Sequence, residues 1–232
     1  MARPVATPPD PFEPAGDLVP AGKVLLRVYS PGRSNRAPND FNPGTSLAVR
    51  ATQRDDVFPV SRFSFFLDDA EPARPVPTLY ASPSENVALW ETLLRDRAPD
   101  DTDALPRALF RGRVLAQVRA SRDLRVASLA GADMHTLNLP PDELTSPGSD
   151  RYAETIPWAR AAWRAGFDGI RYVSRRDPSG LAFVFFDSGQ SAPSFERVRP
   201  GDMLQSFDDL SDDGGFDWLA ARLARWGIVA EL

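Results

Sequence analysis

The sequence predicts a single α+β domain, because segments with a strand-like alternation of apolar and polar residues are interleaved with three amphipathic helical segments. A chain of 232 residues is long for one domain. It can nevertheless bury roughly 70% of the surface that its unfolded form exposes, which allows one well-packed core. The chain shows no internal repeat that would divide it into similar units.

Residues 1–20 are rich in proline and poor in aliphatic side chains, so we expect a disordered or loosely packed leader before a domain over residues 21–232. The stretch MARPVATPPDPFEP lacks the apolar run of a signal peptide. No window approaches roughly 18 consecutive apolar residues, the length that a membrane span needs. We therefore expect a cytoplasmic protein without membrane contact.

The first strand is expected over residues 23–30, KVLLRVYS. Its period of two leaves one face purely aliphatic, with Val24, Leu26 and Val28. The opposite face carries Arg27 and Tyr29, so we expect that face to meet solvent or a ligand.

A long loop-like segment, residues 31–56, is punctuated by Gly, Pro, Asn and Asp, and long loops in compact domains are often functional. A short apolar segment at 60–67 and a strand at 77–82 follow. The strand leads through a Ser-Pro turn into a helix over about 84–95, with Ser84 as its N-cap.

The middle of the chain predicts a proline-containing turn that passes into a strand within residues 106–120, and a second strand at 124–131. A helix follows over residues 154–165. Pro157 is expected in its first turn, where the missing N–H does no harm, and Gly166 is expected as its C-terminal stop.

The last third predicts a hairpin whose turn is the segment RRDPSG. Its first strand, 169–176, contains Ser174, and its second strand, 181–187, is an unbroken apolar run that must be buried on both faces. An amphipathic helix in 216–232, stopped at Gly227, is expected to pack on its own domain.

The composition excludes several classes of protein. A net charge of −5 and a pI near 5.0 argue against direct nucleic-acid binding, which needs a clustered basic face. The absence of cysteine rules out disulfides, thiolate nucleophiles and Cys-based metal sites. The one histidine, His135, cannot form a multi-His metal site and lies among loop signals, so we assign it no role and expect no metal.

Glu91 is the first candidate for chemistry. The helix that carries it is otherwise apolar on that side, through Val87, Leu89, Trp90, Leu93 and Leu94. An ionised carboxylate among such residues costs several kcal/mol unless it is paired or faces a cleft. An ordinary salt bridge to Arg95, four residues on, is the alternative.

Six motifs, in this order, resemble the RES domain family: LLRVYS, FNPG, SRF, VPTLYASPSENVALWETL, YAETIPWARAAW and GFDGIRYVSRR. The resemblance covers residues 23–190. It implies an ADP-ribosyltransferase-like fold with mixed twisted sheets, or a split β-sandwich, flanked by helices. The family consists of bacterial toxins that are usually encoded with a helix-turn-helix antitoxin.

The resemblance also implies the site. The matching catalytic residues are Arg27, Arg62, Glu91 and Ser174. The residues assigned to NAD binding are Arg27, Tyr29, Arg62, Tyr80, Ser82, Thr155 and Ser174. The family's usual glycine before the second arginine is replaced by Ser61, which leaves open how closely that backbone approaches a ligand.

The implied activity is that of a type II toxin that cleaves the nicotinamide–ribose bond of NAD by hydrolysis or phosphorolysis and so arrests growth. NAD would be the substrate, inorganic phosphate a possible co-substrate and an Xre-type antitoxin the partner, with no cofactor required. Forked guanidinium bonds suit the pyrophosphate, and a carboxylate suits an oxocarbenium-like sugar.

Two other functions stay open. A protein ADP-ribosyltransferase would need a surface for its acceptor, for which the 31–56 loop offers Arg33, Arg36, Arg50 and Arg54. A catalytically silent binding module is the other, and in that case Arg27 and Tyr80 would be ordinary strand residues and Ser174 a strand end.

Overall fold

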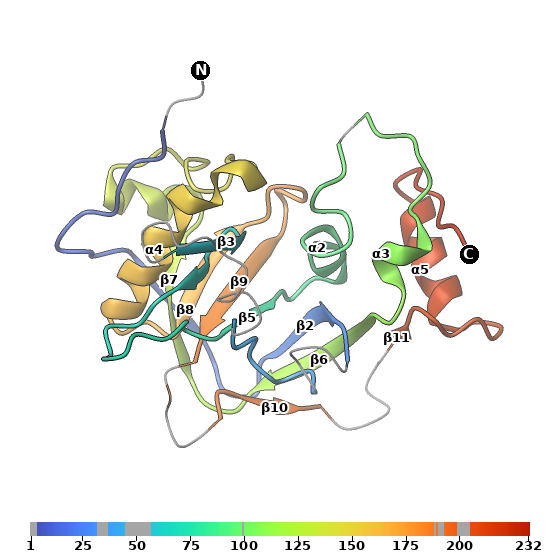
Figure 1. The fold of residues 1–232 in the computed structure, drawn as a ribbon, viewed down its shortest axis with the longest axis horizontal. Helices are drawn as coiled ribbons and strands as arrows, with labels where there is room; N and C mark the ends of the chain where they lie inside the picture. Colours follow the sequence, from blue (N-terminus) through green and yellow to red (C-terminus); the bar gives the residue numbers. More distant parts are fainter. Residues whose placement is uncertain are drawn as a thin grey trace.

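The computed structural model describes residues 4–31, 37–44, 57–98, 100–187, 189, 193–198 and 205–232. Most of the 31–56 loop, including Arg33, Arg36, Arg50 and Arg54, lies outside these residues. The described elements form two larger sheets, a small hairpin and helices that flank them (Figure 1). The predicted α+β class with mixed sheets and flanking helices is confirmed.

The larger sheet has the strand order β1-β7-β8-β9-β5. Its strands are β1 (Gly16–Val19), β7 (Leu124–Leu129), β8 (Gly169–Val173), β9 (Leu181–Phe186) and β5 (Thr78–Ala81). Only the β7–β8 pair is parallel within this sheet. The predicted 169–187 hairpin is confirmed as β8–β9, and β9 is buried on both faces for most of its length.

The second sheet is built around β6 (Val114–Ala120). One edge of β6 pairs with β2 (Val24–Tyr29), and the other pairs with β10 (Phe195–Arg197) and β11 (Gln205–Ser206). The two sheets meet where the amides of Leu26 and Ser82 donate to each other's carbonyls, at 2.7 and 2.8 Å. This junction brings β2 and β5 side by side, so residues of both sheets can face one cavity.

The hairpin of β3 (Val57–Ser61) and β4 (Ser64–Phe66) packs against α4 (Tyr152–Arg164). The other α-helices are α2 (Glu85–Trp90), α3 (Arg107–Phe110) and α5 (Gly215–Ala224), and the short 3-10 helices are η1 (Gly131–Leu137) and η2 (Ser149–Arg151). In Figure 1, α4 lies at one end of the molecule, α3 and α5 lie at the other, and α2 lies between them. None of the described helices has the length and apolar character to cross a membrane.

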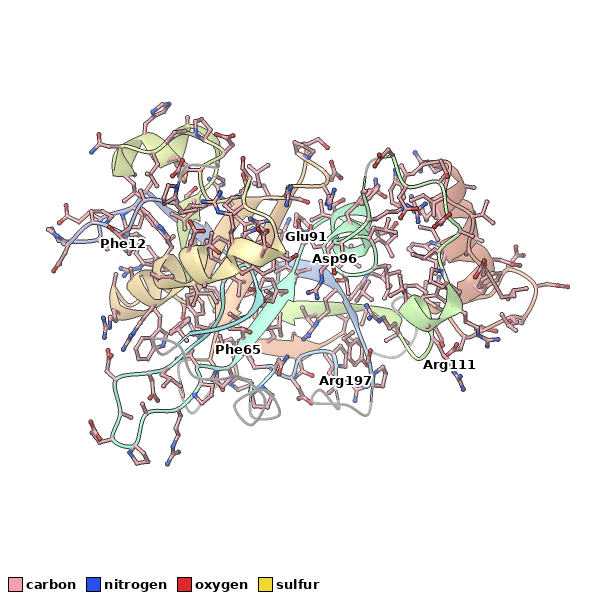
Figure 2. All side chains as sticks on the ribbon, turned by 45° about the horizontal axis from the view of Figure 1, so that its top comes forward. Phe12, Phe65, Glu91, Asp96, Arg111 and Arg197 are labelled. Atoms are coloured by element: carbon pink, nitrogen blue, oxygen red, sulfur yellow. The ribbon has the colours of Figure 1, made fainter. Side chains whose placement is uncertain are left out.

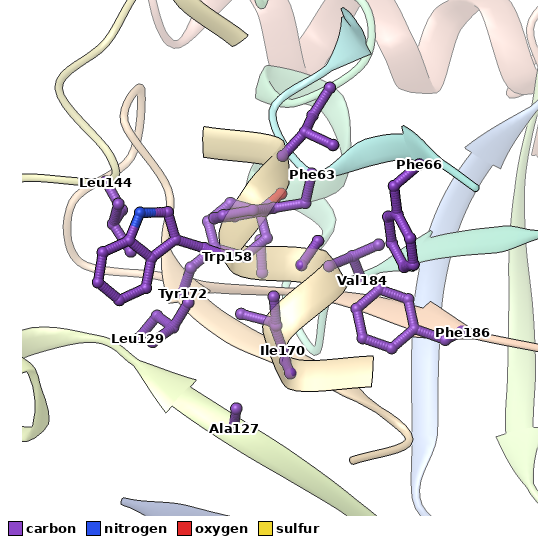
Figure 3. Packing of buried hydrophobic residues seen from close by; sticks show 14 of the residues in the cluster. Phe63, Phe66, Ala127, Leu129, Leu144, Trp158, Ile170, Tyr172, Val184 and Phe186 are labelled. Carbon is purple, nitrogen blue, oxygen red and sulfur yellow. The ribbon is translucent and has the colours of Figure 1, made fainter. Parts of the chain in front are cut away.

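The largest core cluster lies between α4 and the larger sheet. Trp158 on α4 and Ile170 and Tyr172 on β8 are fully or almost fully buried there, together with Phe63 from the turn between β3 and β4 (Figure 3). A second cluster lies under α2, α3 and α5, and a third fills the space between the two sheets. As predicted, the C-terminal helix packs on its own domain, through Leu219 and Leu223.

The proline-rich leader differs from its expected state. Residues 16–19 form an edge strand of the larger sheet, so the ordered domain begins before residue 21. Further upstream, Phe12 packs edge-on against Trp158 at 6.0 Å between ring centroids, and the indole of Trp158 donates to the carbonyl of Ala6. The leader is therefore attached to the domain through contacts of Phe12 and the backbone of Ala6 with Trp158 of the core cluster.

Helix α4 begins at Tyr152, before the expected start at residue 154. The chain enters it directly from η2, so Pro157 lies inside the helix instead of in its first turn. Gly166 follows the helix with a φ of +75°, in the left-handed region that favours glycine, as its place after the apolar pattern predicts.

Glu154 is expected to make the attachment of the leader pH-dependent. Its carboxylate pairs with Arg151 at 2.7 Å and accepts the amide of Val5 at 2.8 Å, and these bonds lower its pKa from 4.5 to about 2. A carboxyl whose pKa is lower in the folded state stabilises the fold above pH 4.5, and this contribution is lost as the pH falls toward 2. The free energy of unfolding of Glu154→Gln should therefore be lower than that of the unchanged protein at pH 6.

Chemical denaturation of both proteins between pH 6 and pH 2 tests this expectation. The difference in stability should be small, because the pair is partly exposed, and it should shrink steadily below pH 4.5. A difference that stays constant over this range would show that Glu154 acts only through its shape.

Candidate functional site

A cavity of about 700 Å³ opens at the junction of the two sheets. Its volume lies within the range of roughly 300–1,000 Å³ that is typical of small-molecule sites. The wall is built from β2, the β3–β4 hairpin, β5, α2 and the segment after α2. Glu91 lies on this wall, near the centre of the molecule in Figure 2.

Arg27 enters the cavity wall from β2 and is only 7% exposed. One guanidinium nitrogen donates to the carbonyls of Pro38 and Asp40, at 2.9 and 3.0 Å, while Nε is buried without a hydrogen-bond partner among the described residues. Burial lowers the pKa of Arg27 to about 10, so the group is still a cation at pH 7. Of the two surroundings expected for this face, solvent or a ligand, Arg27 does not meet solvent, because the 37–44 segment covers it and leaves it only the cavity.

Arg62 lies in the turn of the β3–β4 hairpin and is 5% exposed. It donates to the carbonyls of Leu144 and Pro147, at 3.0 and 3.1 Å, and its Nε is also buried without a partner in the described part of the chain. The hydroxyl of Thr155 donates to the backbone carbonyl of Arg62. A second cationic group is thereby fixed at the cavity from both its side chain and its backbone.

Tyr80 on β5 contributes a phenol whose oxygen is held by the hairpin. It accepts hydrogen bonds from the hydroxyl of Ser61 at 2.8 Å and from the amide of Phe63 at 3.1 Å. Burial raises the pKa of Tyr80 above 10, so the ring is neutral at pH 7. Ser61, which replaces the glycine expected at this position, therefore has a structural use as a partner of Tyr80.

Glu91 caps the C-terminal end of α2, which runs only over Glu85–Trp90 and is shorter than the predicted 84–95 helix. Ser84 is its N-cap, as predicted, and accepts the amide of Val87 at 3.4 Å. The chain leaves the helix in a series of turns after Trp90. These turns direct the side chain of Glu91 toward β8 instead of along the helix toward Arg95.

Two hydroxyl groups hold the carboxylate of Glu91, one from β8 and one from the residue that follows β8. Ser174 donates to Oε1 of Glu91 at 2.6 Å, and Tyr172 donates to Oε2 at 3.3 Å. The oxygen of Ser174 accepts the amides of Arg176 and Asp177, so its hydrogen is left for Glu91. Burial, followed by the charge of Glu91, raises the pKa of Tyr172 well above 10, which keeps it a donor.

The predicted site residues fall into two groups. Five of them line the cavity: Arg27, Arg62, Tyr80, Ser82 and Glu91. The other three lie behind the wall, each against a residue that lines it: Tyr29 against Arg27, Thr155 against Arg62, and Ser174 against Glu91. The three in the second group are placed to position the first group.

Ser82 and Tyr172 modify the predicted set. The hydroxyl of Ser82 donates to the carbonyl of Leu181 at 2.8 Å and accepts the amide of Ser84, so it is already used in joining β5 to α2. Tyr172 lines the cavity but is missing from the predicted residues. The period of two along β8 was the available signal, because it places Tyr172 on the same face as Ser174.

A smaller cavity of about 230 Å³ adjoins the larger one, and the two share Arg62, Glu91, Arg95, Asp96 and Tyr152. The remaining wall of the smaller cavity carries Arg175, Arg176 and the 148–150 turn. Glu91 therefore lines two hollows, and arginines line both of them.

Comparison with known proteins identifies a family and a similar solved structure. The model of the RES domain matches residues 35–207. Among solved structures, a chain from the crystal structure of the M. tuberculosis MbcT–MbcA toxin–antitoxin complex is similar, with 15% identity, a TM-score of 0.46, and coverage of 81% of this chain and 82% of that chain. No curated protein matches the sequence.

Proposed function

The chain belongs to the RES domain family, and from this membership and the geometry of the cavity we propose that it is an enzyme that cleaves the nicotinamide–ribose bond of NAD. The single observation that carries the proposal is the convergence of two buried guanidinium groups and one hydroxyl-bound carboxylate on one cavity of about 700 Å³. Such a set offers charge for a pyrophosphate and an opposite charge for a sugar cation.

Each group has a part in the reaction. Arg27 and Arg62 hold the two negative charges of the pyrophosphate, and the ring of Tyr80 supports the nicotinamide or its ribose. When the bond from C1′ to the nicotinamide nitrogen breaks, its electron pair stays with the ring, which leaves as neutral nicotinamide. Glu91 stabilises the positive charge that develops on the ribose.

The acceptor completes the reaction. Water adds to C1′ and releases a proton to give ADP-ribose, or phosphate adds to give the phosphorylated sugar. Ser174 and Tyr172 keep the carboxylate of Glu91 aimed throughout, because each of them donates a hydrogen bond to one of its oxygens. Tyr29 and Thr155 act indirectly, by holding Arg27 and Arg62.

The biological setting is part of the same proposal and is supported by the family. We infer a cytoplasmic toxin of a type II toxin–antitoxin pair, which depletes NAD and is neutralised by an Xre-type helix-turn-helix partner. The reaction as proposed needs no cofactor, with inorganic phosphate as a candidate co-substrate.

The direct test is to incubate the purified protein with NAD and to separate the products by chromatography. We expect free nicotinamide together with ADP-ribose in phosphate-free buffer, or with its phosphorylated form when phosphate is added. Labelled ADP-ribose attached to protein would instead identify a protein ADP-ribosyltransferase. No nicotinamide under any of these conditions would contradict the proposal and favour a silent binding module.

A further inference from the structure

The large cavity has an apolar part that the chemistry described above does not use. Near Tyr80 and Tyr172, its wall belongs to the core cluster around α4. Another part of the wall is formed by residues under α2 and around α3, which we call the apolar arm: Leu26, Val28, Ala88, Leu93, Leu105 and Leu109. In Figure 1, α4 lies on one side of α2 and α3 lies on the other.

Hydrogen bonds tie the apolar arm to other parts of the chain. Leu105 is held by the C-terminal segment, because its amide donates to the carbonyl of Val229 at 2.6 Å and its carbonyl accepts the amide of Glu231 at 2.9 Å. Arg97 donates to the carbonyl of Asp101 at 2.8 Å and so closes the loop that leads to Leu105. A ligand that enters a preformed site avoids the entropic cost of ordering it.

One side chain of the arm is unusually exposed for its type. Leu109 on α3 lines the cavity and is 40% exposed, whereas the deeper residue Leu105 is almost fully buried. Charged side chains, Arg97, Asp101, Asp103 and Arg113, line the same part of the cavity. An apolar slot with a few polar groups at its edge suits a flat heterocycle that carries its own donors and acceptors.

We propose that the apolar arm holds the adenosine half of NAD, an inference that rests on the proposed function. Arg27 lines the same cavity as Leu26 and Val28 of the arm, so a pyrophosphate bound at Arg27 would place one half of the dinucleotide within reach of the arm. The nicotinamide half lies toward Glu91, and the arm takes the adenine. The arm therefore decides how well the enzyme distinguishes NAD from substrates that lack adenosine.

The variant Leu109→Asp tests this assignment, with Leu210→Asp as its matched control. Leu210 is also an exposed leucine, at 54%, but it does not line the cavity. Each variant is assayed for nicotinamide release from NAD and from nicotinamide mononucleotide, which has the reactive bond but no adenosine. Binding of AMP to each protein is measured separately by calorimetry.

We expect Leu109→Asp to raise KM for NAD by about tenfold at unchanged kcat, because a carboxylate replaces apolar contact with the adenine. Cleavage of the mononucleotide should be unchanged, AMP binding should weaken by a similar factor, and Leu210→Asp should match the unchanged protein. Equal effects on both substrates, or AMP that does not bind the unchanged protein, would overturn the inference. If neither substrate is cleaved, the proposed reaction fails, while AMP binding that depends on Leu109 would still support the adenosine site.

Discussion

Replacing Glu91 with glutamine is expected to lower the rate of nicotinamide release by about 100-fold or more. The change removes one negative charge and preserves the shape of the side chain. Removing a single preorganised group that stabilises transition-state charge typically costs about 10²–10³ in rate. Ser174 can still donate to the amide oxygen of the glutamine, so the positions of both side chains should be retained.

The control for this variant is Glu85→Gln. Glu85 begins the same helix but pairs with Arg222 and does not line the cavity. Its turnover should be close to that of the unchanged protein, and both variants should unfold at similar temperatures. If Glu91→Gln keeps more than a tenth of the activity, the carboxylate does not stabilise the reacting sugar and the proposed mechanism is wrong.

The elements that could be predicted are those whose local chemistry leaves little choice. The Asp-Pro-Ser-Gly turn between two apolar runs produced the β8–β9 hairpin. Ser84 before an apolar run produced an N-cap, and Gly166 after one produced a left-handed stop. In each case, neighbouring residues alone determine the backbone, so no distant contact is needed.

Other features depend on contacts between distant parts of the chain and could not be predicted. The composition of residues 1–20 predicts a disordered or loosely packed leader, yet β1 pairs with β7 and Phe12 packs against Trp158. The period of two along β2 predicted a face toward solvent or a ligand, and only the contacts with the 37–44 segment show that Arg27 meets the cavity instead of solvent. Neither result can be derived from the local pattern of the residues concerned.

The candidate site also combines features that the local sequence predicts with features that depend on distant contacts. Glu91 was singled out because a carboxylate conflicts with the apolar residues around it, and that conflict is visible locally. Its resolution is not local, since the hydroxyls of Tyr172 and Ser174 reach it from a strand far along the chain. The mismatch in the sequence thus identified a group that needs partners. The family resemblance supplied Ser174 as a site residue, whereas only the fold identified Tyr172.

Replacing Arg62 with lysine is expected to lower kcat/KM for NAD by roughly 30- to 150-fold, although the charge is kept. A hydrogen bond to a charged group contributes about 1.5–3 kcal/mol, and the upper part of that range corresponds to this factor. One guanidinium nitrogen of Arg62, Nη1, donates to both carbonyls, of Leu144 and Pro147, which leaves the rest of the group for a ligand. A lysine has one nitrogen for all of these tasks, so it cannot hold the 144–147 segment and bind a pyrophosphate in one geometry.

The matched control is Arg164→Lys. Arg164 lies on α4, is about half exposed, pairs with Asp69 at the surface and does not line the cavity. Its kcat/KM should therefore be unchanged. Steady-state kinetics on both variants, with thermal unfolding measured alongside, separates loss of substrate binding from loss of fold. Activity of Arg62→Lys within threefold of the unchanged protein would mean that the guanidinium of Arg62 serves the 144–147 segment alone, and the pyrophosphate would then have to be held by Arg27.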